Sequence, residues 1–308
     1  YEITTRLVGS EMCIRDSVHT VVNQQSPEIH NAVNRDEVCA GDQGIMFGYA
    51  CDENDEYMPL TIYYAHLLAR QLTKVRREHP DLLKPDGKTQ VSVEYENDEI
   101  KRIDTIVVST QHSKDITQEE IKELIMNEVI KPCIDEKYLD ENTKYFINPS
   151  GSFVVGGSWG DSGTTGRKIV CDTYGGRGRI GGGCFSSKDP TKVDRSAAYY
   201  SRYVAKNIVA NGLARRCEVE VAYAIGRAQP VSLCVDTFGT GKFDDEKLLE
   251  IVKKNFNFEV GNIISELDLR KPVYHKTSCY GHFGDPQFTW EKVVVMSEMK
   301  IFKLLHVY

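Results

Sequence analysis

The sequence predicts an α+β protein, in which helices back antiparallel strands, rather than a protein of strictly alternating strands and helices. Two observations carry this prediction. Strands occur as neighbouring pairs, the first at 89–96 with 103–110, and amphipathic helices accompany each pair. The same pattern occurs twice along the 308 residues, so we expect two similar blocks. The blocks span residues 36–154 and 156–294.

The first block begins with an apolar segment at 40–50 that is interrupted by glycines, and a helix follows it. Asp42 lies between Gly41 and Gly44, where an aspartate is more often a turn residue than a ligand. Pro59 then begins a helix, because Leu60 and the apolar residues that follow it at helical spacing form one stripe.

A turn, the hairpin and a capped helix complete this block. Pro85-Asp86-Gly87 is a turn signal directly before the first hairpin strand. Thr117 and Glu120 have the spacing of a capping box, which predicts a helix over 117–130. A further strand is expected over 144–157, interrupted by a proline turn.

The second block contains a long helix and a second strand pair. Asp189 has the position of an N-cap, Pro190 fits the first helical position and Gly212 ends the helix. The strands at 217–225 and 231–238 are predicted to be antiparallel neighbours. Shorter helices are expected at 244–256 and 263–269.

The two ends of the chain fit this pattern poorly. Residues 1–17 show no period and are expected to be disordered or extraneous. Residues 18–22 can form a short strand, which runs into a polar segment around Pro27 that is either a linker or a mobile lid. Residues 295–308 form an apolar and basic tail that matches nothing else in the chain.

Composition excludes several classes of protein. A 41% hydrophobic and 27% charged content is typical of a soluble globular protein. The sequence has neither an apolar run of roughly 20 residues nor a signal peptide. Nine scattered cysteines without a CxxC pair indicate reduced thiols, so we expect a cytoplasmic protein without a membrane partner.

The stretch from 160 to 199 organises the predicted functional site. The whole chain carries a formal charge of −7, yet this stretch gathers cations around a run of glycines. Glycine lets the backbone approach a ligand, and amides beside cations bind phosphate oxygens. Lys188 and Lys192 lie near the predicted helix start, where cations oppose the macrodipole unless an anion shares the site. The cations are Arg167, Lys168, Arg177, Arg179, Lys188, Lys192 and Arg195.

Four carboxylates interleave with these cations: Asp161, Asp172, Asp189 and Asp194. This mixture suits a metal-bound polyphosphate better than a nucleic-acid backbone, and the isoelectric point near 5.7 also argues against nucleic acid. Asp161 and Asp194 are candidate ligands of Mg²⁺, which prefers hard oxygen ligands and bridging phosphates. The residues alone predict a nucleotide triphosphate site and leave the reaction open.

Other motifs give no support to a different enzyme class. Residues 176–181 match GxGxxG, but the strand and helix that a dinucleotide site needs do not flank them. Residues 166–169 lack the Ser or Thr that follows GK in a Walker A loop. The GxSxG pattern of serine hydrolases is also absent from the sequence.

The glycine-rich stretch resembles a known family. Gly181 to Asp189, GGGCFSSKD, is similar to the glycine-rich signature of methionine adenosyltransferases, also called S-adenosylmethionine synthetases. Ala40 to Ala50, AGDQGIMFGYA, resembles their other signature. Shorter agreements are KVDRSAAY, GRKI, KPDGKTQV, DTYGG and YGHFG, and the similarity runs from about Val18 to Val293.

The resemblance implies three similar α+β domains related by pseudo-threefold symmetry. Two of them would be present, a central domain at 36–154 and a C-terminal domain at 156–294. Residues 18–35 would be a remnant of the amino-terminal domain with its gating loop. The implied assembly is a homodimer or a pair of dimers, with active sites between subunits.

The resemblance also implies a reaction, in which the sulfur of methionine attacks the ribose 5′ carbon of ATP. Triphosphate leaves whole and is then cleaved to pyrophosphate and phosphate. The catalytic cations on the triphosphate would be Lys88, Arg167, Lys168 and Lys188. The other nucleotide-binding residues would be Asp86, Gly87, Ser152, Phe153, Asp161 and Cys184, with Phe153 stacked on adenine. Methionine and the nucleoside would be contacted by Gln25, Asp42, Asp161, Lys192 and Ile225. Asp194 would ligate Mg²⁺, with two magnesium ions per site and a potassium ion as cofactors.

The chain departs from the family pattern at several positions. Ser152 stands where arginine is common, Ile180 where histidine is usual and Cys184 where alanine is usual, and Cys39 replaces a signature glycine. The family's first domain carries an HPDK-type motif and glutamates for methionine and potassium, which have no counterpart in these residues. We therefore expect this chain to lack turnover by itself. The alternative to an enzyme is a catalytically incomplete binding partner of an active subunit.

Overall fold

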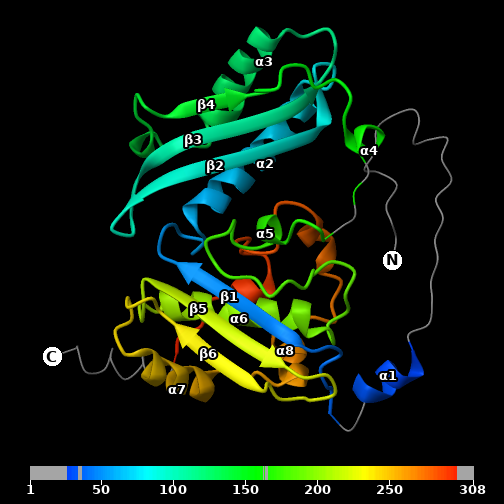
Figure 1. The fold of residues 1–308 in the computed structure, drawn as a ribbon, viewed down its shortest axis with the longest axis vertical. Coiled ribbons are helices and arrows are strands. Elements are labelled where there is room, and N and C mark those ends of the chain that lie inside the picture. Colours follow the sequence, from blue (N-terminus) through cyan, green and yellow to red (C-terminus); the bar gives the residue numbers. More distant parts are fainter. Residues whose placement is uncertain (1–25, 34–36, 162, 164–165, 297–308) are drawn as a thin grey trace. The chain divides into compact units, whose positions relative to one another are not determined.

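A computed structural model of the chain describes residues 26–33, 37–161, 163 and 166–296. These residues form two compact units, each with its own sheet and helices (Figure 1). The first unit contains residues 61–161 and 163, and the second contains 26–33, 37–60 and 166–296. The predicted domain limits, 36–154 and 156–294, stay a prediction, because the compact units divide the chain in another way. The predictions for residues 1–25 and 297–308 lie outside the described residues.

The first unit is built on a three-stranded sheet with the order β2-β3-β4. The predicted hairpin is confirmed: β2 (Leu83–Glu96) pairs antiparallel with β3 (Glu99–His112). Asn97 and Asp98 join them with φ angles of 52° and 63°, as a two-residue hairpin turn requires. The third strand, β4 (Lys144–Ile147), pairs parallel with β3, so the sheet is mixed.

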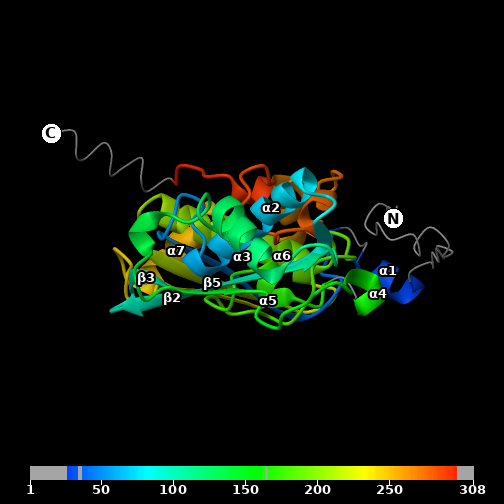
Figure 2. The same ribbon diagram turned by 90° about the horizontal axis from the view of Figure 1, so that it is seen from above.

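Helices cover one face of this sheet (Figure 2). The long helix α2 (Leu60–Glu78) contacts β2 through a 2.7 Å hydrogen bond from the Thr89 hydroxyl to the Ala65 carbonyl. The short helix α3 (Gln118–Leu124) has the predicted Thr117–Glu120 capping box and continues as a π-helical turn at Ile125–Ile130. The predicted helix over 117–130 is therefore confirmed, with a change of helix type in its second half.

The predicted turn at Pro85-Asp86-Gly87 is wrong. These residues lie within β2, where the pairing register shifts between Leu83 and Gly87. Leu83 pairs with His112 and Gly87 with Thr110, so three residues of β2 oppose Gln111 alone. The chain bulges here instead of reversing, because β3 continues to pair with it on both sides of the triplet.

The second unit has an antiparallel sheet with the order β1-β5-β6. The predicted strand pair is confirmed as β5 (Arg216–Tyr223) and β6 (Ser232–Asp236). The sequence did not predict β1 (Gly44–Cys51), whose glycines obscured a strand that pairs along its full length with β5. The two units together confirm the α+β class.

Three helices pack on one face of this sheet, and α6 (Val193–Ala210) is the central one (Figures 1 and 2). Gly48 of β1 lets α6 approach closely, since a Cβ atom there would lie 1.9 Å from the Ser201 carbonyl carbon. The other two helices are α7 (Asp245–Asn255) and α8 (Val260–Glu266).

The remaining elements are short. The first unit contains α4 (Gly157–Gly160) and the 3₁₀ turn Glu136–Tyr138, and the second unit contains α5 (Ile169–Asp172) and the 3₁₀ turns Tyr274–Ser278 and Thr289–Glu291.

Two expectations about helix starts are corrected. Asp189 is not the N-cap of α6: its carboxylate accepts a 2.9 Å hydrogen bond from the Thr191 amide within a turn, and the helix begins at Val193. Where a polar loop was expected around Pro27, the residues Pro27–Val33 form α1. Proline fits the first helical position there because its missing N–H is not needed.

All eight cysteines in the described ranges are free. None of the helices in those ranges combines the length and apolar character needed to cross a membrane.

A buried charge cluster fixes α6 inside the second unit. Both side chains of the Arg202–Glu291 pair are fully buried, and their charged atoms lie 2.8 Å apart. Lys206 also donates to Glu291, at 2.8 Å. Arg202 further donates to the carbonyl oxygens of Tyr49 and Tyr57, each at 2.8 Å. Burial alone would raise the Glu291 pKa, but the two cations outweigh it and hold that pKa below its usual range.

We predict that Glu291→Gln destabilises the second unit by about 3 kcal/mol, because it leaves two buried cations without a counter-charge. The chain has two tryptophans, and Trp290 is the buried one. In a Trp159→Phe background, urea unfolding followed by tryptophan fluorescence therefore reports on the second unit.

Glu250→Gln is the matched control. The Lys247–Glu250 pair has a similar separation, 2.7 Å, but its side chains are 56% and 71% exposed. Its loss should cost at most about 1 kcal/mol. Equal losses in the two variants would show that burial of the Glu291 cluster is unimportant.

Candidate functional site

A glycine strap, defined here as residues 176–183, packs against β1 in the second unit. A Cβ atom at Gly181 would lie 1.7 Å from the Ile45 carbonyl oxygen, and one at Gly178 would lie 2.8 Å from Tyr49 Cβ. Neither contact leaves room for a side chain. These two glycines are therefore required by packing against the strand, independently of any ligand.

Glu218 anchors the strap to β5. Its carboxylate accepts a 2.8 Å hydrogen bond from the Arg179 amide, and the Arg179 guanidinium lies 3.2 Å away. Glu218 is paired with Tyr49 across the sheet, so it belongs to the face opposite α6. Burial raises the pKa of Glu218.

The centre of the site is an ion pair between Lys188 and Asp194. Lys188 Nζ donates to Asp194 Oδ2, and both side chains are largely buried. Asp194 lies in the first turn of α6, where a carboxylate is favourable to the helix dipole. Gly183 makes room for this carboxylate, because a Cβ atom there would lie 2.2 Å from Asp194 Cγ. The glycine-rich signature thus seats an acidic side chain beside its lysine.

The other signature lies next to this pair. The Gly41 amide donates to the Thr191 carbonyl at 2.9 Å, and a Cβ atom at Gly41 would lie 3.2 Å from Lys192 Nζ. Asp42 follows directly and accepts a 2.9 Å hydrogen bond from the Gln43 amide. Ile225 is exposed, and the neighbouring Gly226 amide donates to the Ala40 carbonyl at 2.9 Å.

Arg167 and Lys168 reach the same part of the unit by another route. Both side chains are exposed and directly precede α5. A Cβ atom at Gly166 would lie 2.9 Å from Cys184 Cβ, so the segment that carries these cations touches the segment that carries Lys188. The second unit therefore brings together most of the predicted residues from four separate stretches of sequence.

The first unit brings together a second group. The Asp86 carboxylate accepts a 2.9 Å hydrogen bond from the Gly157 amide. A Cβ atom at Gly156 would lie 2.8 Å from the Phe153 ring and 3.2 Å from Asp86 Oδ2. Gly87 and the exposed Lys88 follow Asp86 along β2. Asp86 and Phe153 thus lie close together at the bulged end of the hairpin, and Lys88 lies two residues after Asp86 on the same strand.

Three predicted residues remain outside these groups. Ser152 and Asp161 are exposed in the first unit, beside Phe153 and directly after α4. Gln25 lies outside the described residues.

The described residues fit Mg²⁺ only in part. They contain no group of three or more His, Cys, Asp or Glu side chains arranged to hold a metal ion. Mg²⁺ is usually bound by one or two carboxylates together with substrate phosphates and water. The Asp194 carboxylate packs over Gly183 and lies beside Lys188, a candidate phosphate-binding lysine. Asp194 therefore suits that mode of binding as a single protein ligand.

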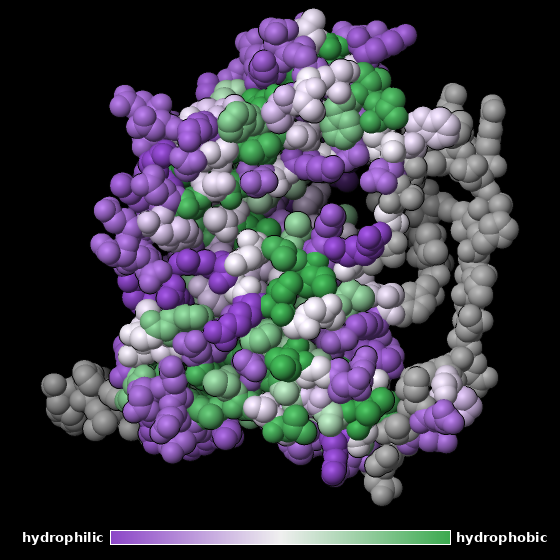
Figure 3. All heavy atoms as spheres, in the orientation of Figure 1, coloured by the Kyte–Doolittle hydropathy of each residue, from purple (hydrophilic) through white to green (hydrophobic). Residues whose placement is uncertain are grey.

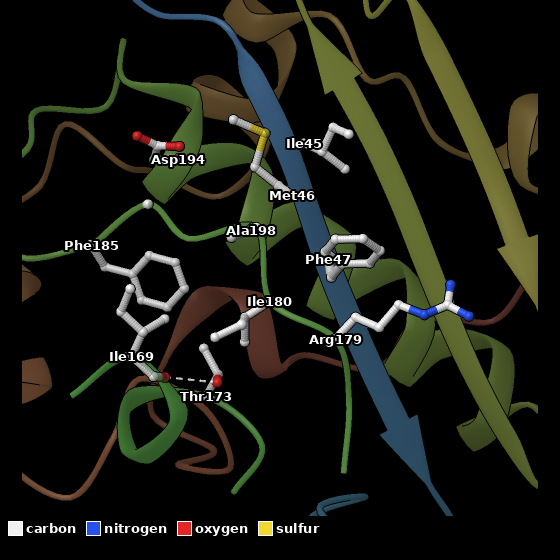
Figure 4. Close-up of a pocket in the computed structure, with 12 residues that line it drawn as sticks. Ile45, Met46, Phe47, Ile169, Thr173, Arg179, Ile180, Phe185, Asp194 and Ala198 are labelled. Carbon is white, nitrogen blue, oxygen red and sulfur yellow. Dashed lines mark hydrogen bonds between the residues drawn. The ribbon is translucent and has the colours of Figure 1, made fainter. Parts of the chain in front are cut away.

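A small pocket adjoins the site between β1, α5, the strap and α6 (Figure 4). Figure 4 shows Phe185, Ile169 and Ile180 gathered at one end and Asp194 at the other. Its volume of about 20 Å³ is close to that needed for one water molecule. A nucleotide therefore does not fit inside it.

The sequence analysis counted Arg195 among the cations of the glycine-rich stretch, but it missed the support layer to which this residue belongs. The support layer is a buried set of side chains behind Lys188 that consists of Arg195, Tyr199, Thr277 and His282. The Arg195 guanidinium donates to the Lys188 carbonyl, the Tyr199 hydroxyl and the Thr277 hydroxyl at 3.1, 3.0 and 3.2 Å. The Tyr199 hydroxyl is 2.6 Å from His282 Nδ1. The YGHFG agreement, which contains His282, was the signal in the sequence that carried no assigned role.

His282 is neutral in this layer. Burial, followed by the nearby Arg195 guanidinium, lowers its pKa from 6.5 to about 3. Its ring packs against Phe185 at a centroid distance of 5.0 Å.

Comparison with known proteins gives consistent matches. The model of the S-adenosylmethionine synthetase central domain matches residues 37–153, and that of the C-terminal domain matches residues 155–292. The S-adenosylmethionine synthase of Syntrophobacter fumaroxidans (strain DSM 10017 / MPOB) is 53% identical, over 92% of this chain and 75% of the relative.

We predict that His282 makes the second unit acid-sensitive. The histidine binds a proton in the unfolded chain below pH 6.5 but not in the folded unit until about pH 3. Stability contributed by the neutral ring is therefore complete above pH 6.5 and falls as the pH decreases, by about 2 kcal/mol at pH 5. Urea unfolding between pH 8 and pH 5, followed by Trp290 fluorescence, measures this loss.

His282→Asn should flatten that pH dependence, while the exposed His275→Asn should leave it unchanged. Among the described residues, Tyr199 and Arg195 lie against His282, and burial raises the pKa of Tyr199. The same slope in the His282→Asn variant and the wild type would contradict the prediction.

We also predict that Gly183→Ala destabilises the second unit by about 1–3 kcal/mol, because its methyl group would overlap the Asp194 carboxylate. Gly261→Ala is the control, since a Cβ atom in that position of α8 meets nothing closer than 3.8 Å. Thermal unfolding of both variants tests the difference, and equal melting temperatures would contradict the steric argument.

Proposed function

Because the chain belongs to the S-adenosylmethionine synthetase family, we propose that it forms S-adenosylmethionine from ATP and L-methionine. The methionine sulfur attacks the ribose 5′ carbon, the carbon–oxygen bond breaks, and triphosphate leaves with the bonding electrons. Water then cleaves triphosphate to pyrophosphate and phosphate. The observation that supports this proposal best is the Lys188–Asp194 pair, which the glycine-rich signature seats beside Lys192 and the Gly166 segment.

The leaving triphosphate defines the role of the cations. Its charge develops on oxygen as the bond to carbon breaks, so fixed positive groups lower the barrier. We assign this role to Arg167, Lys168 and Lys188 in the second unit and to Lys88 in the first. The ion pair keeps the Lys188 ammonium in place before the anion binds, because its partner Asp194 is itself held over Gly183.

The remaining assignments follow the family resemblance. We propose that Phe153 stacks on adenine, with Asp86, Gly87, Ser152, Asp161 and Cys184 lining the nucleotide site. We assign methionine and the nucleoside to Asp42, Asp161, Lys192, Ile225 and Gln25. In support, Asp42, Lys192 and Ile225 adjoin one another in the second unit through Ala40 and Gly41.

Magnesium is part of the proposal, with Asp194 as the residue that would hold it. A bound Mg²⁺ would neutralise phosphate oxygens. Two magnesium ions and one potassium ion per site are what the family resemblance implies, and we assign no residue of this chain to potassium.

We propose a cytoplasmic homodimer or pair of dimers. Apolar side chains remain exposed in the single chain on β1 and on the strap that packs against it: Ile45 is 45% exposed and Ile180 is 39% exposed. Figure 3 shows hydrophobic residues scattered over the visible face of the second unit. The support for an association surface is the closeness of Ile45 and Ile180, which line the same pocket, because neighbouring exposed apolar side chains mark interaction sites more than scattered ones do.

The first test of the site uses inorganic tripolyphosphate. Isothermal titration with MgCl₂ present should show binding by the wild-type chain and a loss of about 100-fold in Lys188→Ala, because one charged contact to the anion disappears. Lys253→Ala, on the exposed last turn of α7, is the control and should bind normally. Wild-type affinity in Lys188→Ala would overturn the assignment.

Turnover is tested on a longer chain, because the relative extends beyond the matched part. Joining the part of that relative which the match leaves out to this chain should give ATP- and methionine-dependent S-adenosylmethionine, and Lys188→Ala should reduce the rate by about 100-fold or more. The alternative, a binding partner without turnover, predicts instead that the chain co-purifies with a full-length relative while the fusion stays inactive.

A further inference from the structure

The support layer lies directly behind the proposed triphosphate site and contacts it through the backbone of Lys188. Arg195 follows Asp194 directly, but its side chain points into the protein and is only 5% exposed. It therefore does not reach a ligand bound at Lys188. Its contact with that lysine is to the backbone carbonyl, at 3.1 Å, and leaves the Lys188 ammonium to Asp194.

We propose that Arg195 is a positioning residue for anion binding, which holds Lys188 from behind. One guanidinium nitrogen fixes the Lys188 carbonyl, and the other two bind hydroxyls of α6 and of the 3₁₀ turn at Tyr274–Ser278. The planar fork of an arginine makes three such contacts at once, which a lysine ammonium does not reproduce in this geometry. The identity of the anion, triphosphate, rests on the proposed function.

The charge of Arg195 is unusual for a buried group. Buried cations are normally paired with a carboxylate, as Arg202 is with Glu291 in the same helix. Within the described part of the chain, Arg195 has only neutral partners: a carbonyl, two hydroxyls and the Tyr274 ring, whose centroid is 4.0 Å from the guanidinium carbon. An anion at Lys188 would supply the missing counter-charge.

The same layer ties the other cation-bearing segments to Arg195. The His282 amide donates to the Asp172 carbonyl at 2.9 Å, which attaches the end of α5 and hence the Arg167–Lys168 segment. Phe185, three residues before Lys188, packs against Tyr199 at a centroid distance of 5.6 Å. Loosening Arg195 therefore disturbs Lys188 first and the neighbouring segments through Tyr199 and His282.

The test compares two buried cations of α6. Arg195→Met removes the proposed positioning residue, and Lys206→Met removes a cation of similar burial that belongs to the Glu291 cluster. Both variants are expected to lose stability. Titration with inorganic tripolyphosphate and MgCl₂ should show affinity reduced about tenfold or more in Arg195→Met and unchanged in Lys206→Met. Arg195→Lys, which keeps the charge but not the fork, should recover part of the loss.

A second measurement needs no ligand. Hydrogen exchange of the peptide that contains Lys188 should become faster in Arg195→Met, while Lys206→Met leaves that peptide unchanged. Unchanged affinity and exchange in Arg195→Met would overturn the inference and leave the proposed function standing. Equal losses of affinity in both variants would also overturn it, because general destabilisation would then explain the effect. A wild-type chain that binds no tripolyphosphate would refute both proposals together.

Discussion

The second unit depends on keeping one carboxylate ionised in its interior. Glu291 is surrounded by Arg202, Lys206 and the Gly284 amide, which donates to it at 2.9 Å. Taking these charges out of water is costly, and only complete pairing makes the arrangement stable. Through Arg202 the cluster also satisfies carbonyl groups at the end of β1 and in the loop after it. Through these contacts the cluster attaches the middle of α6 to β1 and to the 3₁₀ turn that carries Glu291.

Glycine serves two physical purposes in the site, and the sequence shows only that glycines are present. Gly48, Gly178 and Gly181 allow backbone segments to pass closer together than any side chain permits. Gly183 instead leaves space for the carboxylate of Asp194. Since β1 is an edge strand of its sheet, the strap that packs against it also shields an edge which other chains would otherwise pair with.

Periodic elements were the easiest part to predict. The hairpin, the Thr117 capping box and the strand pair β5–β6 follow from local pattern, and the structure confirms them. The strand β1 was missed because it contains Gly44 and Gly48, which face residues of α6 that are remote in sequence. Asp189 has the chemistry of an N-cap, yet its carboxylate binds the Thr191 amide and the helix starts later. The cations of the glycine-rich stretch, Arg195 included, were visible in the sequence. The role of Arg195 in the support layer depends on tertiary contacts between α6 and the segment from 277 to 282, which no local pattern shows.

The order of the two units along the chain has a consequence for folding. Strand β1 is made early, but its partner β5 follows more than 150 residues later, as the pairing of Gly44 with Tyr223 shows. The first unit lies between them as one nearly continuous segment, so its own contacts become available first during synthesis. The apolar strand β1 of the second unit stays unpaired until the residues that follow the first unit have been synthesised. Closing so long a loop slows folding more than it lowers final stability. The intervening unit, once folded, shortens that loop by acting as a compact insertion in place of a flexible chain.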